Sequence, residues 1–181
     1  MRRIALFAVL ALSLAALLPA ATLQKLSLGD MSQKSTAIVR ARVLSSYAQQ
    51  HGSLIYTHYR IQVSEWWKGS GATALDVVVP GGLAGGLRQT FSGAPQLPSG
   101  GELVLFLWTG SSGLTHIIGL SQGLFKVQRD ASGEIMATRA ASTETMLDPA
   151  SGRSVGDEAL AFRLSDLHQR VSAAISSGGQ K

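Results

Sequence analysis

The chain has 181 residues, no cysteine, and 16 basic against 11 acidic residues, which gives a formal net charge of +5. The lack of cysteine excludes a disulfide scaffold and any thiolate metal site. The basic residues are few and form no dense cluster, which argues against nucleic acid as a partner. No residue pattern points to a cofactor.

The first segment predicts export. Two arginines precede an apolar run over 4–18, which ends in the small-residue sequence 19–21. A charged start, a hydrophobic stretch and a small-residue end are typical of a secretory signal peptide, here 1–21, with cleavage after Ala20 or Ala21. An uncleaved anchor is the alternative, because the apolar character persists to Leu23 and approaches the length of a membrane span.

Beyond the leader we expect a single domain over 22–176 and a disordered tail over 177–181. About 160 residues suit one domain with one core. The remaining chain has no second apolar run of membrane-spanning length, so we expect no membrane partner once the leader is removed. A cysteine-free exported protein fits a bacterium better than a small eukaryotic secreted domain, and we expect it in the periplasm or outside the cell.

The first predicted elements are one helix and three strands. Apolar residues at roughly helical spacing predict a short amphipathic helix over 22–34. The spacing then changes to alternation, which predicts strands over 37–43, 54–67 and 75–79. Proline followed by two glycines at 80–82 ends the third strand.

The second half predicts a long loop and more strands. Segment 81–101 is rich in Gly, Pro and Ser, so we expect a mobile excursion with one weak strand near 87–92. The apolar run 103–108 predicts a central strand that is buried on both faces. Two turns, at 110–113 and 130–133, predict hairpins that lead to strands 114–118, 124–129 and 134–138.

A helix is predicted at the carboxyl end. Ser154 to Asp157 resembles a capping box. The helical stripe that follows consists of Leu160, Leu164, Leu167, Val171 and Ile175. Short strands between turns, flanked by two helices, predict a mainly β fold: a small OB-like antiparallel β-barrel with a short N-terminal helix and a C-terminal capping helix.

Several motifs carry a resemblance to known proteins. They are AIVRARV at 37–43, YRIQV at 59–63, WKG at 67–69, VPGG at 79–82, GE at 101–102, LFL at 105–107 and GLSQGLF at 119–125. With these motifs the chain resembles uncharacterised exported bacterial proteins. Its first half, 37–108, is also similar to the netrin-like module of tissue inhibitors of metalloproteinases, which implies an OB-type barrel. Those inhibitors place an amino-terminal cysteine on the protease zinc, and this chain has none.

One candidate ligand surface follows from the strand pattern. Arg40, Arg42 and Arg60 fall on the wet faces of adjacent predicted strands, and Tyr56 and Trp66 lie nearby in sequence. OB-type barrels commonly bind ligands on one open face. These five residues are therefore candidate ligand-binding residues, and the expected ligand is an extracytoplasmic protein or an anionic glycan. The alternative is an ordinary solvated strand face.

Catalytic patterns are weaker. The sequence 119–123 matches the nucleophile elbow G-x-S-x-G around Ser121, but the alternating residues that follow predict a strand where the elbow needs a helix. The alternative is a glycine-bounded turn in which Ser121 and Gln122 bond local backbone. The chain's histidines are scattered without zinc-site spacing, and we interpret each as structural or solvated; they are His51, His58, His116 and His168.

Carboxylates near predicted strand ends, namely Glu65, Asp76 and Glu102, do not identify an acid–base pair from sequence alone. The glycine-rich sequence 81–86 lacks the Lys-Ser/Thr ending of a phosphate-binding loop. The leading hypothesis is therefore an exported, non-enzymatic binding module. The alternatives are a protease-inhibitor-like module that acts through 81–101 and, third, a serine hydrolase using Ser121.

Overall fold

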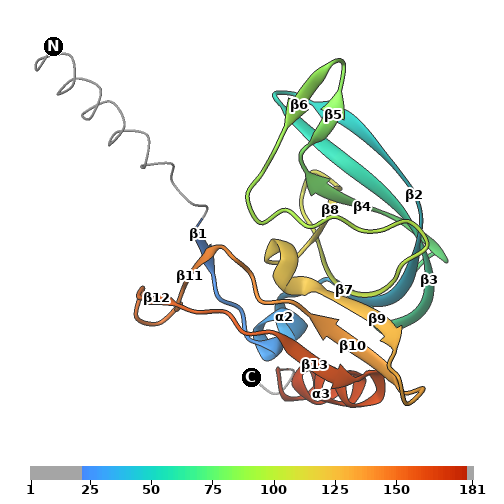
Figure 1. Ribbon diagram of the computed structural model, residues 1–181, viewed down its shortest axis with the longest axis vertical. Coiled ribbons are helices and arrows are strands. Elements are labelled where there is room, and N and C mark those ends of the chain that lie inside the picture. The colour runs from blue at the N-terminus through green and yellow to red at the C-terminus, as the bar shows by residue number, and fades with distance from the viewer. Residues whose placement is uncertain (1–21, 179–181) are drawn as a thin grey trace, which may run out of the picture.

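The computed structural model describes residues 22–178, so the predicted leader at 1–21 and the last three residues lie outside the described part of the chain. Within residues 22–178 the protein is mainly β, with an 8-stranded sheet, two smaller sheets and a C-terminal helix, as Figure 1 shows. The expectation of a mainly β fold with a helix at the carboxyl end is confirmed.

The main sheet has the spatial order β13, β10, β9, β7, β2, β3, β4, β8, and β8 also pairs with β7. In chain order its strands are β2 (Ala37–His51), β3 (Leu54–Lys68), β4 (Ala74–Pro80), β7 (Glu102–Thr109), β8 (Thr115–Ile117), β9 (Leu124–Arg129), β10 (Ile135–Arg139) and β13 (Leu160–Arg163). The predicted central strand is confirmed, because β7 lies between β2 and β9 and its residues 103–107 are buried.

Two smaller sheets flank the main one. A 3-stranded sheet contains β1 (Thr22–Gln24), β11 (Thr145–Leu147) and β12 (Ser154–Val155). A 2-stranded hairpin contains β5 (Gly82–Ala84) and β6 (Leu87–Gln89), so the predicted weak strand near 87–92 is shorter than expected and has a partner. Figure 1 shows this hairpin at the end of β2 and β3 that is remote from the helices.

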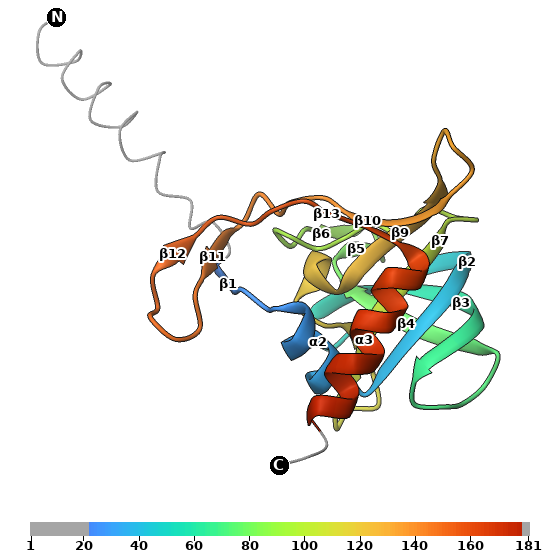
Figure 2. The same cartoon turned by 90° about the horizontal axis from the view of Figure 1, so that it is seen from below.

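Apolar side chains form two clusters, one on each side of the main sheet. The first lies among strands β2, β3, β4, β7 and β8 and includes Ile61 and Leu105. The second lies between the other side of the sheet and the helices α2 (Leu28–Lys34) and α3 (Leu164–Gly178), and it includes Phe106 and Leu167. Figure 2 shows α2 and α3 side by side against this face. The alternation along each strand therefore supplies two cores, because both faces of β7 are apolar.

The predicted helix over 22–34 is wrong in its first part. Residues 22–24 form β1, which pairs in parallel with β11, more than a hundred residues downstream. Helix α2 begins only at Leu28, where Ser27 and Asp30 form a capping box. Local spacing could not indicate β1, because its hydrogen-bond partners are distant in sequence.

The predicted capping box at 154–157 is also wrong. Ser154 and Val155 form β12, and the Asp157 carboxylate pairs with the buried Arg139 guanidinium at 2.7 Å. Residues 160–163 form β13 on the edge of the main sheet, so α3 begins at Leu164. It runs to Gly178, past the start of the predicted tail.

Strand β2 is much longer than predicted and carries a bulge. It runs from Ala37 to His51 and pairs with β3 along its whole length, with a register shift between Val43 and Ser45. An extra residue in one strand reverses which side chains face each side of the sheet beyond it. Beyond Leu44, the odd-numbered residues of β2 therefore share a face with the even-numbered residues of β3.

Candidate functional site

A row of directly paired residues crosses five strands on the outer face of the sheet. Tyr47 of β2 pairs with His58 of β3, His58 pairs with Val78 of β4, Val78 pairs with His116 of β8, and His116 pairs with Trp108 of β7. Directly paired residues present their side chains on one face. With two neighbours from the β2–β3 hairpin, the rings of this row form what we call the aromatic band: Tyr47, His51, Tyr56, His58, Trp108 and His116.

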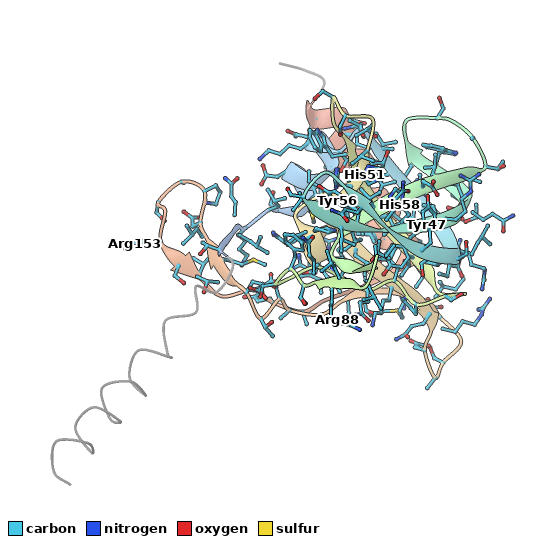
Figure 3. All side chains as sticks on the ribbon, turned by 90° about the horizontal axis from the view of Figure 1, so that it is seen from above. Tyr47, His51, Tyr56, His58, Arg88 and Arg153 are labelled. Carbon is cyan, nitrogen blue, oxygen red and sulfur yellow. The ribbon has the colours of Figure 1, made fainter. Side chains whose placement is uncertain are left out.

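The rings of the aromatic band contact one another along the row. Tyr47 stacks on His58 with ring centroids 4.8 Å apart and an interplanar angle of 11°. Tyr56 lies edge-on to His116 at 5.9 Å, and Trp108 is 6.2 Å from His116. Figure 3 shows Tyr47, His51, Tyr56 and His58 gathered on the β2–β3 hairpin. These separations lie within the range of favourable aromatic pairs, so the band is a connected surface.

Two histidines of the band meet directly. The Nε2 atoms of His51 and His58 are 3.2 Å apart. Burial lowers the pKa of His58, neighbouring His51 lowers it further, and Asp76 acts in the opposite direction with a smaller effect. Burial also lowers the pKa of His116. Both shifts favour the neutral form of the His58 and His116 rings.

Both ends of the band are open to solvent. Tyr47 is 50% exposed and Trp108 is 48% exposed. A hollow of about 590 Å³ lies beside Trp108, and its other lining residues are Lys34, His116, Ile117, Ile118 and Gly119. Exposed aromatic side chains next to an apolar hollow are typical of interaction surfaces.

The three predicted arginines are held by carboxylates. Arg40 bonds Glu65 and Glu102, each at 2.6 Å. Arg42 donates to the Gly100 carbonyl at 3.0 Å and lies 3.8 Å from Glu102. These pairs bring together two of the carboxylates that the sequence could not place, but they serve as ion-pair partners of Arg40.

The third arginine, Arg60, lies 3.8 Å from Asp76. The arginine face thus carries as many carboxylates as guanidinium groups, and its net charge is close to zero. Surface pairs of this kind contribute little to stability, but they reduce the attraction of the face for an anion.

The two predicted aromatic ligands lie in different places. Tyr56 belongs to the aromatic band, close to His116. Trp66 packs against the first apolar cluster, on the side of the sheet opposite Arg40, so its predicted place beside the arginines is wrong. A register shift in the β2–β3 pairing between Arg40 and Ala41 accounts for this, because it breaks the simple alternation along β3.

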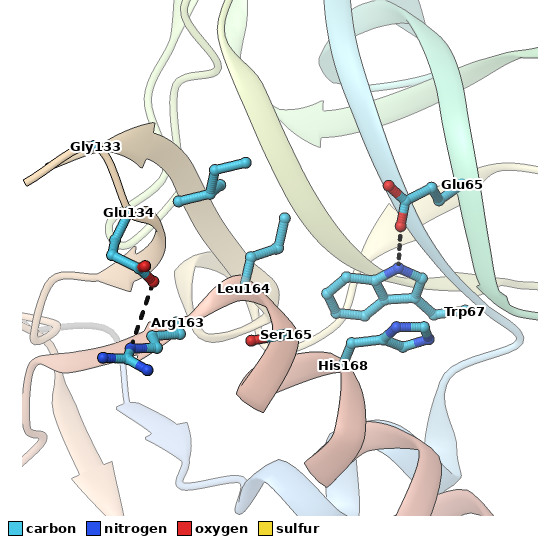
Figure 4. Close-up of a pocket in the computed structure, with 9 residues that line it drawn as sticks. Glu65, Trp67, Gly133, Glu134, Arg163, Leu164, Ser165 and His168 are labelled. Carbon is cyan, nitrogen blue, oxygen red and sulfur yellow. Dashed lines mark hydrogen bonds and ion pairs between the residues drawn. The ribbon is translucent and has the colours of Figure 1, made fainter.

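Figure 4 shows a cavity of about 430 Å³ between β3 and α3. Trp67 and His168 stack on each other at one side of it with centroids 4.6 Å apart, and Glu65 accepts a bond from the Trp67 ring nitrogen. Burial favours a higher pKa for Glu65, but the bonds from Trp67 and Arg40 outweigh it and hold that pKa below its usual range. Glu134 and Arg163 on this cavity lie 3.5 Å apart, and Glu65 is paired with Arg40 outside the lining, so the carboxylates and the guanidinium group of the lining already have charged partners.

Ser121 lies in a single turn of 3₁₀ helix, η1 (Leu120–Gly123), between β8 and β9. Gly119 and Leu120 have positive φ, of 61° and 56°, and a strand follows η1 where the nucleophile elbow requires an α-helix. Ser121 also lines a cavity of about 630 Å³ whose lining residues include no histidine or carboxylate. The surroundings of Ser121 favour the turn interpretation.

Gln122 does not bond local backbone as expected. Its buried amide accepts from the Leu26 N–H at 2.8 Å and donates to the Gln24 carbonyl at 2.9 Å. A Cβ on Gly123 would lie 2.6 Å from the Ile118 carbonyl, so this close approach requires glycine. Gly123 and Gln122 of this motif thus have structural roles, in the packing of the turn and in the attachment of the amino-terminal segment.

Sequence reasoning missed the aromatic band, because it placed the histidines as scattered residues. The available signal was the Gly52-Ser53 turn, which would have folded His51 back toward His58 had the alternation been followed past Leu44. Within residues 22–178 no group of three or more histidines and carboxylates is arranged to hold a metal ion. No helix in that part of the chain is long and apolar enough to span a membrane.

Comparisons of the chain with protein-family models, with curated proteins and with solved structures find no match.

Proposed function

We propose that the protein is a non-enzymatic binding module that contacts another protein through the aromatic band. The observation that carries the proposal is the connected row of rings across five strands, with Tyr47 and Trp108 half-exposed at its ends. Tyrosine and tryptophan supply most of the binding energy in many protein interfaces. A protein partner is favoured over an anionic glycan, because the predicted arginine face is neutralised by its own carboxylates.

The pairing pattern supports an OB-like barrel as the framework of this module. Strand β8 pairs with β7 and, through Val78 and His116, with β4, so hydrogen-bonded neighbours run from β7 through β2, β3, β4 and β8 back to β7. OB-type barrels bind ligands on an open outer face. The netrin-like resemblance, export and a periplasmic or extracellular partner belong to the same proposal.

The test is affinity capture with three forms of residues 22–181. The wild type, the double variant Tyr47→Ala/Trp108→Ala and the control Arg40→Gln/Arg60→Gln are immobilised and exposed to the exported proteins and cell-wall material of the source organism. We expect one protein to be retained by the wild type and by the arginine control and to be lost from the aromatic double variant.

A salt gradient distinguishes the other ligand class. An anionic polysaccharide that elutes at modest salt, and whose retention fails in the arginine control, would contradict the proposal, because exposed charge pairs weaken as ions screen them. Equal retention of every protein by the wild type and the aromatic double variant would also contradict it.

A protease-inhibitor-like module remains the second candidate, and one observation favours it. Residues 82–89 of the 81–101 segment form a hairpin whose Leu83 and Leu87 are exposed, at 54% and 61%. Exposed leucines on a protruding hairpin suit insertion into a protease cleft. Inhibition of a metalloprotease from the same organism at micromolar concentration, lost in Leu83→Ser/Leu87→Ser, is the expected result for this candidate; no inhibition would exclude it.

A further inference from the structure

The histidine pair at the open end of the aromatic band has the geometry of a metal-ligand pair. The Nε2 atoms of His51 and His58 face each other at 3.2 Å. Two imidazole nitrogens bound to one tetrahedral Zn²⁺ at about 2.0–2.1 Å are about 3.3 Å apart. Two adjacent nitrogens on a square-planar ion would be closer, at about 2.9 Å, so the spacing fits a tetrahedral ion better.

The surroundings hold both rings in place. Tyr47 stacks on the His58 ring, and Tyr56 lies edge-on to the His51 ring with centroids 6.0 Å apart. His58 is buried and His51 is exposed at the hairpin end, so one ligand is fixed and the other borders solvent. Because the rings are already packed, they lose little conformational freedom when an ion binds. The exposed His51 ring gives the ion access from solvent.

We propose that His51 and His58 form a Zn²⁺ site in which the chain supplies two ligands and two positions stay open to solvent. When Zn²⁺ binds, the ring that donated the hydrogen bond gives up its Nε2 proton and carries a proton on Nδ1 instead, so that both neutral rings present an Nε2 lone pair to the ion. No third histidine or carboxylate of residues 22–178 completes the set. The open positions are therefore filled by water or by a group from another molecule. The site rests on the histidine pair alone and does not depend on the partner proposed for the band.

The test is calorimetric titration of the tag-free protein with ZnCl₂ in a buffer that does not chelate zinc. We expect saturable binding by the wild type and at least about a 10-fold loss of affinity in His51→Ala, since even groups that only orient a zinc ligand contribute that much. His51 is the residue to change, because it is exposed, whereas removal of buried His58 would also disturb packing.

The matched control is His116→Ala, which removes a histidine from the same band but outside the pair; we expect it to bind zinc as the wild type does. Co²⁺ provides a second readout, because tetrahedral Co²⁺ absorbs visible light far more strongly than octahedral Co²⁺. Strong absorption that is lost in His51→Ala supports the site. No binding at millimolar zinc, or equal binding by His51→Ala, would overturn it and leave the pair as a hydrogen bond.

Discussion

Two regions of the β2–β3 ribbon differ in what covers the same face of the sheet. In the first half, Ile38 is fully buried beneath the helices, Trp67 stacks on His168 of α3, and Lys68 donates to the carbonyls of Ser32 and Gln33 in α2. In the second half the same face carries the aromatic band without a helix over it. An uncovered sheet face is usually polar. Its aromatic character here is the reason for our proposal that a partner covers this part of the face, as the helices cover the other part.

The largest expected contrast lies on one strand. Phe106 and Trp108 of β7 lie on the same face, but Phe106 is fully buried in the second apolar cluster and Trp108 is half-exposed. We expect Phe106→Ala to lower the free energy of unfolding by about 3–5 kcal/mol. Trp108→Ala should lower it by about 1 kcal/mol or less. Urea unfolding of both variants checks this, and equal losses would break the comparison between a covered and an uncovered face.

A smaller loss of stability is expected where Gln122 attaches the β1–α2 segment to the rest of the fold. Gln122→Ala leaves the Leu26 N–H and the Gln24 carbonyl without their partner, which should lower the free energy of unfolding by about 1–3 kcal/mol. The neighbouring change Ser121→Ala should have almost no effect, which makes it the matched control. If the two variants unfold alike, Gln122 does not attach the β1–α2 segment to the sheet.

Glu65, in the helix-covered half of the ribbon, should make the free energy of unfolding depend on pH. The pKa of Glu65 lies below its usual value of 4.5 because bonds from Trp67 and Arg40 outweigh burial. Its contribution to stability is therefore fully present above pH 4.5 and is lost as the pH falls through the lower folded-state pKa. Urea unfolding between about pH 6 and pH 2 should show a shallower acid decline for Glu65→Gln than for the wild type. Identical slopes would contradict the account of the Arg40 pairs.

Much of the fold followed from alternation, and the errors have one physical origin. The strands at 37–43 and 54–67 were predicted because their apolar residues repeat with period two, and the strand at 103–108 because it is a short, continuous apolar run. The strands β1, β12 and β13 were missed because their stabilising partners are distant in the chain, and β12 lies where a capping box was expected. Local pattern does not report such pairing.

The candidate site was harder to predict for a related reason. Tyr56 was selected, but His51 and His58 were interpreted separately, because the bulge at Leu44 and the polar residues after it hide the register that brings them together. The arginines were placed correctly on one face, yet sequence could not show that Glu65, Glu102 and Asp76 lie within reach of them. An ion pair between two strands can be predicted only when the register of those strands is known.

Only a small loss of stability is expected from truncating two rings of the aromatic band, and this variant gives the decisive measurement. Tyr47→Ala/Trp108→Ala should lower the free energy of unfolding by less than about 2 kcal/mol, since it removes two half-exposed rings and one stacking contact. Capture of the protein partner by this folded variant, side by side with the wild type, tests the central claim most directly. The account expects the partner to be lost while the fold is kept; full retention of the partner would contradict it.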